Sequence, residues 1–83
     1  MYEESQQIAM QFDKATYEQN ADDLKALIEK IEQDVENYDI CNRVQLYYSL
    51  ATAVSDLWSI ENPDKQKDND TIQKTLYYYR KAI

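Results

Sequence analysis

The sequence contains no glycine, and this absence limits the folds that the chain can adopt. Glycine normally supplies the positive-φ positions of strand hairpins and helix C-caps, and it forms the loops that cradle phosphate groups. Pro63 is the single proline, while the good helix formers Glu, Gln, Lys, Leu and Ala are abundant. The 83 residues therefore predict one all-α domain, 1–83, with long helices joined by polar turns.

Apolar residues spaced three and four apart predict four helices, which pair as two antiparallel hairpins. The first hairpin occupies 1–38, with helices expected over about 3–18 and 21–37. Asn20 and Asp23 are expected to cap the second of these helices in a tight turn, which requires the two helices to run antiparallel. The second helix has a continuous apolar stripe made of Leu24, Leu27, Ile28, Ile31 and Val35.

The second hairpin occupies 39–83 and contains a long polar loop. Asp39 is expected to cap a helix over about 40–59, the loop is predicted over 60–70, and Asp70 is expected to begin a helix over about 71–83. The inner positions predicted for this last helix are Ile72, Leu76, Tyr79, Ala82 and Ile83.

The second hairpin resembles a tetratricopeptide (TPR) repeat over about 42–83. Tyr47, Leu50, Ala51 and Val54 occupy the aromatic, leucine, small and large positions of the first TPR helix, and Tyr79 and Ala82 occupy the aromatic and small positions of the second. Thr75 stands where the family has alanine, and the loop is about a dozen residues longer than the family's turn. The resemblance implies that Leu50 and Tyr79 are buried against each other's helix, and that 1–38 is a degenerate repeat.

The same hairpin is also similar to TPR-type regions that precede HEPN-type ribonuclease domains in bacterial defence proteins. The similar segments are QLYYSLATAVSDLW at 45–58 and TLYYYRKAI at 75–83. Those nucleases share an R-x4-6-H motif, and this chain has no histidine, so that activity cannot reside in it. This second resemblance implies that the chain is the N-terminal, recognition part of a larger protein.

The composition argues against catalysis and against bound metals. Without histidine the chain lacks the commonest general base and metal ligand, so we predict no catalytic residue, no cofactor and no metal site. Glu29, Glu32 and Glu36 lie on neighbouring turns of one helix but opposite its apolar stripe, where we expect them to be solvated. Cys41 has no partner cysteine and is expected to fill space near a helix start.

The net charge limits the partners that we expect for this chain, and the lack of targeting signals limits its expected location. Sixteen acidic and nine basic residues give a net charge of −7, which repels nucleic acid backbones, so direct nucleic acid binding is not expected. The chain has neither an apolar run of about 18 residues nor a signal peptide, which predicts a cytoplasmic protein without membrane association.

The eight tyrosines are the feature best suited to recognition, because tyrosine offers a large, rigid contact area with a polar end. Tyr48, Trp58, Tyr77 and Tyr78 are the predicted partner-binding residues, and packing in the core or at its boundary is the competing interpretation of the tyrosines.

The sequence thus predicts a helical-repeat module for protein–protein interaction. The alternative function is a small acidic inhibitor, or nucleic-acid mimic, that blocks a basic site on a target protein. Stable repeat stacks need about three repeats, so we expect the far face of the last helix, with Tyr77 or Tyr78 and Ile83, to contact a second copy, a continuation of the chain or a target.

Overall fold

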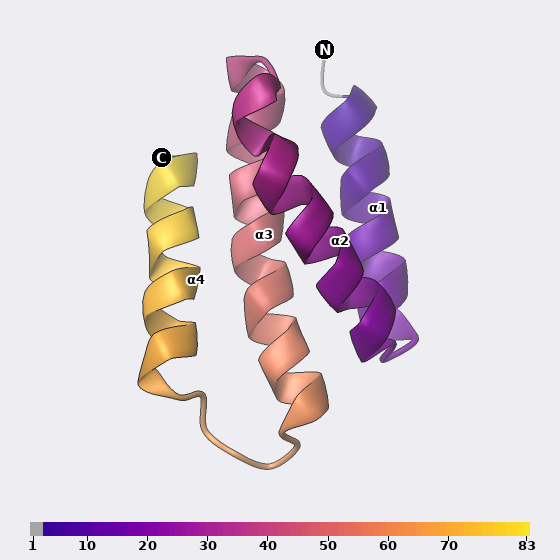
Figure 1. Ribbon diagram of the computed structural model, residues 1–83, viewed down its shortest axis with the longest axis vertical. Helices are drawn as coiled ribbons and strands as arrows, with labels where there is room; N and C mark the ends of the chain where they lie inside the picture. Colours follow the sequence, from indigo (N-terminus) through magenta and orange to yellow (C-terminus); the bar gives the residue numbers. More distant parts are fainter. Residues whose placement is uncertain (1–2) are drawn as a thin grey trace.

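The computed structural model describes residues 3–83 and confirms the all-α fold. Its elements are α1 (Glu3–Tyr17), α2 (Ala21–Asp34), a 3-10 turn (Val35–Asn37), α3 (Ile40–Glu61) and α4 (Asn69–Ala82). The long helix α3 lies at the centre and packs against α1, α2 and α4. In Figure 1, α1 and α4 flank α3 on opposite sides, and α2 slants across the front. Within residues 3–83 no helix is both long and apolar enough to cross a membrane.

Side-chain caps determine where three of the helices begin. The backbone N–H of Asp23 donates to Asn20 Oδ1 (3.1 Å) and that of Asn42 donates to Asp39 Oδ1 (2.9 Å), so both predicted caps are confirmed. The predicted start of α4 at Asp70 is wrong. The Thr71 backbone N–H instead donates to Asp68 Oδ1 (2.8 Å), and α4 begins two positions earlier than expected. An aspartate caps a helix well when it lies three residues before a helical N–H, and both Asp68 and Asp70 can take that place. The sequence therefore allows two competing starts for α4.

Two non-glycine residues make the turns in which glycine is usual. Gln19 has φ 53° in the turn between α1 and α2, and Asp64 has φ 65° in the loop between α3 and α4. The turn after α1 is closed by the Asn20 N–H, which donates to the Ala15 carbonyl (2.9 Å). A left-handed conformation costs a residue with a Cβ atom roughly 1–2 kcal/mol. The chain therefore forms its tight turns without glycine, at some cost in stability.

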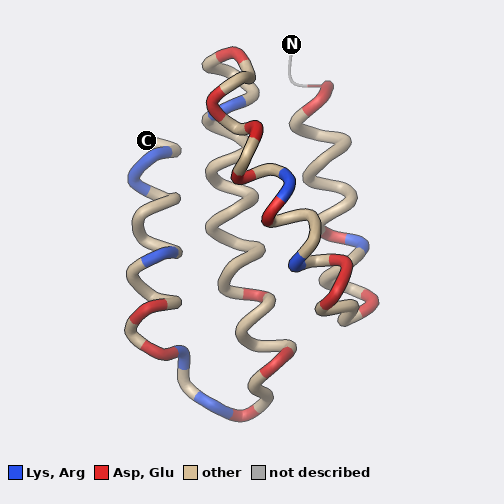
Figure 2. Tube along the Cα trace, viewed as in Figure 1, with Lys and Arg blue, Asp and Glu red and all other residues tan. Residues whose placement is uncertain are grey.

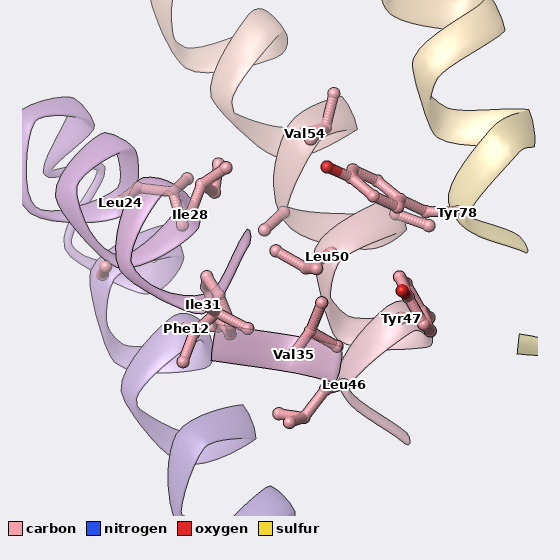
Figure 3. Packing of buried hydrophobic residues seen from close by; sticks show 13 residues of the cluster. Phe12, Leu24, Ile28, Ile31, Val35, Leu46, Tyr47, Leu50, Val54 and Tyr78 are labelled. Carbon is pink, nitrogen blue, oxygen red and sulfur yellow. The ribbon is translucent and has the colours of Figure 1, made fainter. Parts of the chain in front are cut away.

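The core forms where α2 and α1 pack against α3, as Figure 3 shows for its labelled side chains. Leu24, Leu46 and Leu50 have no exposed surface. The predicted apolar stripe is confirmed, with Leu27 at its half-buried edge, although α2 ends at Asp34 and Val35 lies in the 3-10 turn. The large buried side chains are Phe12, Leu24, Ile28, Ile31, Val35, Leu46, Tyr47, Leu50, Val54 and Tyr78.

The predicted inner face of α4 is wrong by about one position. Ile72, Leu76 and Ile83 are 41%, 40% and 103% exposed, whereas Tyr78 is 8% exposed and belongs to the core. Tyr79 is only half-buried, so the predicted burial is confirmed for Leu50 but not for Tyr79. The backbone of α4 packs against α3 alone among the described helices, so only a narrow face of α4 is covered.

Candidate partner-binding groove

A groove of about 310 Å³ lies between α2 and α4, and α3 forms most of its floor. Figure 1 shows why it opens: α2 slants away from α4 toward the end where α4 begins. The floor is apolar and consists of Ile28, Val54, Leu57 and Trp58. The walls and ends are polar and consist of Lys25, Glu29, Glu32, Glu61, Asp70, Thr71 and Lys74. An apolar floor inside a charged rim is the usual composition of a protein contact site.

Glu32 ties α2 to α4 across one end of this groove. Its carboxylate accepts a hydrogen bond from the Tyr78 hydroxyl and lies 3.0 Å from Lys74 Nζ. Beside it, the Tyr47 hydroxyl donates to Glu36, and the rings of Tyr47 and Tyr78 stack with centroids 5.9 Å apart. The expectation that Glu32 and Glu36 are merely solvated is therefore wrong. Tyrosines from α3 and α4 bind both carboxylates, and the bond to Glu32 fixes one end of the groove.

This environment stabilises the neutral form of both tyrosines. Burial, followed by the hydrogen bond to Glu36, raises the pKa of Tyr47 to about 12. Burial and the hydrogen bond to Glu32 raise the pKa of Tyr78 well above its ordinary value. A phenolate could not donate to a carboxylate and would be repelled by it. Both hydroxyls therefore remain donors up to strongly alkaline pH.

We expect the free energy of unfolding to fall as pH rises above about 10, where unfolded tyrosine ionises. The folded state still holds the Tyr47 proton up to a pKa of about 12. The contribution of Tyr47 to stability is thus complete below the pKa of tyrosine in the unfolded chain. It is lost as pH rises through the pKa of Tyr47 in the folded protein. Urea unfolding at neutral and alkaline pH measures this loss. A double variant, Tyr47→Phe with Tyr78→Phe, should lose distinctly less stability on the same change of pH, and an equal loss would contradict the assignment.

Trp58 is the aromatic residue on the floor of the groove, and its indole lacks a hydrogen-bond acceptor. Asn62 anchors the backbone at this point, since its N–H donates to the Trp58 carbonyl (2.8 Å). Trp58 Nε1 and Thr75 Oγ1 are the buried side-chain polar atoms without a hydrogen-bond partner among residues 3–83. A buried donor left without an acceptor costs about 1–3 kcal/mol. Nε1 is itself buried, so this unpaired donor lowers the stability of the region around Trp58 and is not displayed to a ligand.

The four predicted partner-binding residues do not share one surface. Trp58 lies in the α2–α4 groove, and Tyr77 is 52% exposed on α4 with Lys81 Nζ 5.6 Å from its ring centre. Tyr48 is 57% exposed, lines another groove between α1 and α3, and contacts Tyr79 edge to face. The expectation for Tyr78 is corrected, because its ring packs on Tyr47 in the core.

The groove between α1 and α3 has a volume of about 250 Å³ and a different chemistry. Asp13 and Asp56 both line it, and burial, with a smaller contribution from Asp13, raises the pKa of Asp56. Lys67 opposes this shift. A larger groove of about 380 Å³, between α1 and α2, is lined by charged and aliphatic residues such as Lys14 and Leu27 and by no aromatic side chain. The α2–α4 groove is thus the one that combines a tryptophan on its floor with a charged rim.

Sequence reasoning missed most of the residues that form the candidate groove. Glu61 and Asp70 fall in the segment predicted as a solvated loop, and Glu29 was assigned to a solvated helix face. No pattern along the chain marks them, because only the packing of α2 and α4 on α3 brings them together.

Within the described part of the chain, no group of three or more cysteine, aspartate or glutamate side chains could hold a metal ion. In comparisons with known proteins, no family model, curated protein or solved structure matches this chain.

Proposed function

We propose that this protein is a protein–protein interaction module, without catalytic activity, that binds a segment of a partner in the groove between α2 and α4. The observation that carries the proposal is the apolar floor around Trp58, open to the surface and rimmed by charge. Tryptophan in a partly desolvated pocket is a typical anchor of binding energy. We further propose that the protein acts in the cytoplasm.

We also propose that α3 and α4 form a TPR-like hairpin, with 3–38 as a degenerate preceding repeat. All four positions that the resemblance assigns to the first TPR helix are buried: Tyr47, Leu50, Ala51 and Val54. This agreement supports the proposal for α3. The half-buried Tyr79 is a departure from the pattern, and it concerns only the register of α4.

Selection of peptides from a defined random library on the purified protein tests the proposed function. Trp58 is the single tryptophan, so its fluorescence reports directly on occupancy of the groove. Selected peptides should change this emission. Trp58→Phe keeps an aromatic ring but reduces the apolar area of the floor, and it should weaken binding by about 2- to 10-fold, as measured by calorimetry. Tyr48→Phe, which removes a hydroxyl outside the groove, should bind like the parent. Peptides that bind without altering the emission, and equally to Trp58→Phe, would contradict the proposed site.

The acidic surface favours one other candidate function, an inhibitor that occupies a basic nucleic-acid site on its target. Figure 2 shows acidic residues recurring along α2, and the net charge of the chain is −7. Ionic strength separates the two candidates. Binding by polyanion mimicry weakens steeply as salt is added, whereas binding through an apolar groove around Trp58 weakens much less.

A further inference from the structure

We infer that the α2–α4 groove selects a partner segment in which a large apolar side chain is flanked by lysine or arginine. This inference rests on the proposed function and names the chemistry of the occupant. It follows from the charges on the rim and the shape of the groove.

The rim of the groove carries an excess of unpaired negative charge. Its ionisable residues are four acidic side chains, Glu29, Glu32, Glu61 and Asp70, and two basic ones, Lys25 and Lys74. Glu32 and Lys74 neutralise each other at 3.0 Å. Glu29, Glu61 and Asp70 form no ion pair within residues 3–83, which leaves three carboxylates around the open part of the groove against the single ammonium group of Lys25.

These three carboxylates come from different helices and therefore surround the floor. Glu29 lies on α2, Glu61 at the end of α3 and Asp70 in the first turn of α4, and Figure 2 shows acidic positions at the end of α3 and the start of α4. A basic side chain on either flank of an inserted apolar group would thus meet a carboxylate. Complementary charge of this kind increases the association rate and excludes acidic competitors.

The size of the groove restricts the apolar anchor. Its volume of about 310 Å³ is at the lower end of the range of small-molecule sites, about 300–1,000 Å³, so it suits one or two side chains better than a whole helix. The bonds from Tyr78 and Lys74 to Glu32 hold α2 and α4 together at one end. A Leu-sized or Phe-sized side chain would enter from the other end and pack over Leu57 and Trp58.

Three designed peptides without tryptophan test the inference. The first carries a Leu-Phe pair flanked by arginines, the second has glutamates in place of the arginines, and the third keeps the arginines but replaces Leu-Phe by Ser-Ser. The first peptide should bind and change Trp58 emission. The second and third should each bind about 10-fold more weakly or worse, because one loses the charge complementarity and the other loses the buried apolar group.

Two triple variants with the same change in net charge identify the carboxylates responsible. Glu29→Gln, Glu61→Gln and Asp70→Asn together should weaken the arginine peptide by about 10-fold and abolish its advantage over the glutamate peptide. The control combines Glu4→Gln, Asp22→Asn and Asp34→Asn, exposed positions that do not line this groove, and it should change affinity by no more than about 2-fold. Circular dichroism of each variant verifies that the helices are retained.

Each other outcome overturns a specific claim. Equal binding of the arginine and glutamate peptides with altered Trp58 emission would refute the charge selection and leave the proposed function intact. Equal weakening by both triple variants would reduce the effect to general attraction by an acidic protein and would also refute the inference. Binding of none of the three peptides, in a protein whose random-library peptides do alter the emission, would refute the named chemistry alone. If the random-library peptides also fail to alter the emission, the proposed function is refuted together with the inference.

Discussion

Leu50→Ala is expected to lower the free energy of unfolding by about 2–5 kcal/mol, the usual cost of removing a fully buried leucine side chain. Leu50 has no exposed surface and lies near the middle of α3, the helix against which the other three pack. Domains of this size have total stabilities of only about 5–15 kcal/mol, so the variant should be unfolded in a large fraction of molecules or melt far below the parent. Urea and thermal unfolding followed by circular dichroism measure the effect.

Leu76→Ala is the matched control for that result. It removes the same atoms from α4, but Leu76 is 40% exposed and the substitution should cost less than about 1 kcal/mol. If Leu50→Ala melted at the same temperature as Leu76→Ala, close to that of the parent protein, α3 would not have a central position in the core.

The elements that local patterns specify could be predicted from the sequence. The apolar stripe from Leu24 to Val35, in α2 and the turn that follows it, repeats at helical spacing, and only a helical segment can bury it on one side. Asn20 and Asp39 precede apolar segments and cap helices through their own side chains, an interaction that spans three residues. These features depend on neighbours in the chain, so the sequence alone contains them.

The register of α4 could not be predicted, because neighbours in the chain do not determine it. Tyr77, Tyr78 and Tyr79 are chemically identical, and any of them could face inward. Tyr78 is selected by partners on other helices, the ring of Tyr47 on α3 and the carboxylate of Glu32 on α2. The pair Tyr78 and Glu32 is 46 residues apart in sequence.

The candidate groove was missed for the same reason. The sequence identified Trp58 as a recognition residue but placed Glu61 in a solvated loop and Asp70 at the end of that loop, where it was expected to begin the last helix. In the structure α3 extends to Glu61 and α4 starts at Asn69, so both acidic residues belong to helices. Whether a carboxylate stands alone or beside an apolar floor depends on how the helices cross, and a single sequence does not give that angle.

Because the backbone of α4 packs on α3 alone, Tyr78 should contribute more than any other residue to holding α4 in place. Its ring stacks on Tyr47, and its hydroxyl reaches past α3 to Glu32. Tyr78→Ala should therefore lower the free energy of unfolding by about 3–5 kcal/mol, the range for a buried aromatic side chain. Urea unfolding followed by circular dichroism, with Trp58 fluorescence as a local probe beside α4, measures the loss.

The adjacent tyrosine provides the control, since the same substitution one position earlier tests the register of the helix directly. Tyr77 is 52% exposed, and Tyr77→Ala removes its tilted contact with Tyr78 and the Lys81 ammonium near its ring. That loss should cost less than about 1 kcal/mol, because exposed contacts of this kind are weak. Tyr79→Ala should lie between the two, as a half-buried ring against Tyr48. If Tyr79→Ala were instead the most destabilising of the three, the register inferred from the sequence would be right and the position of Tyr78 in the core would be wrong.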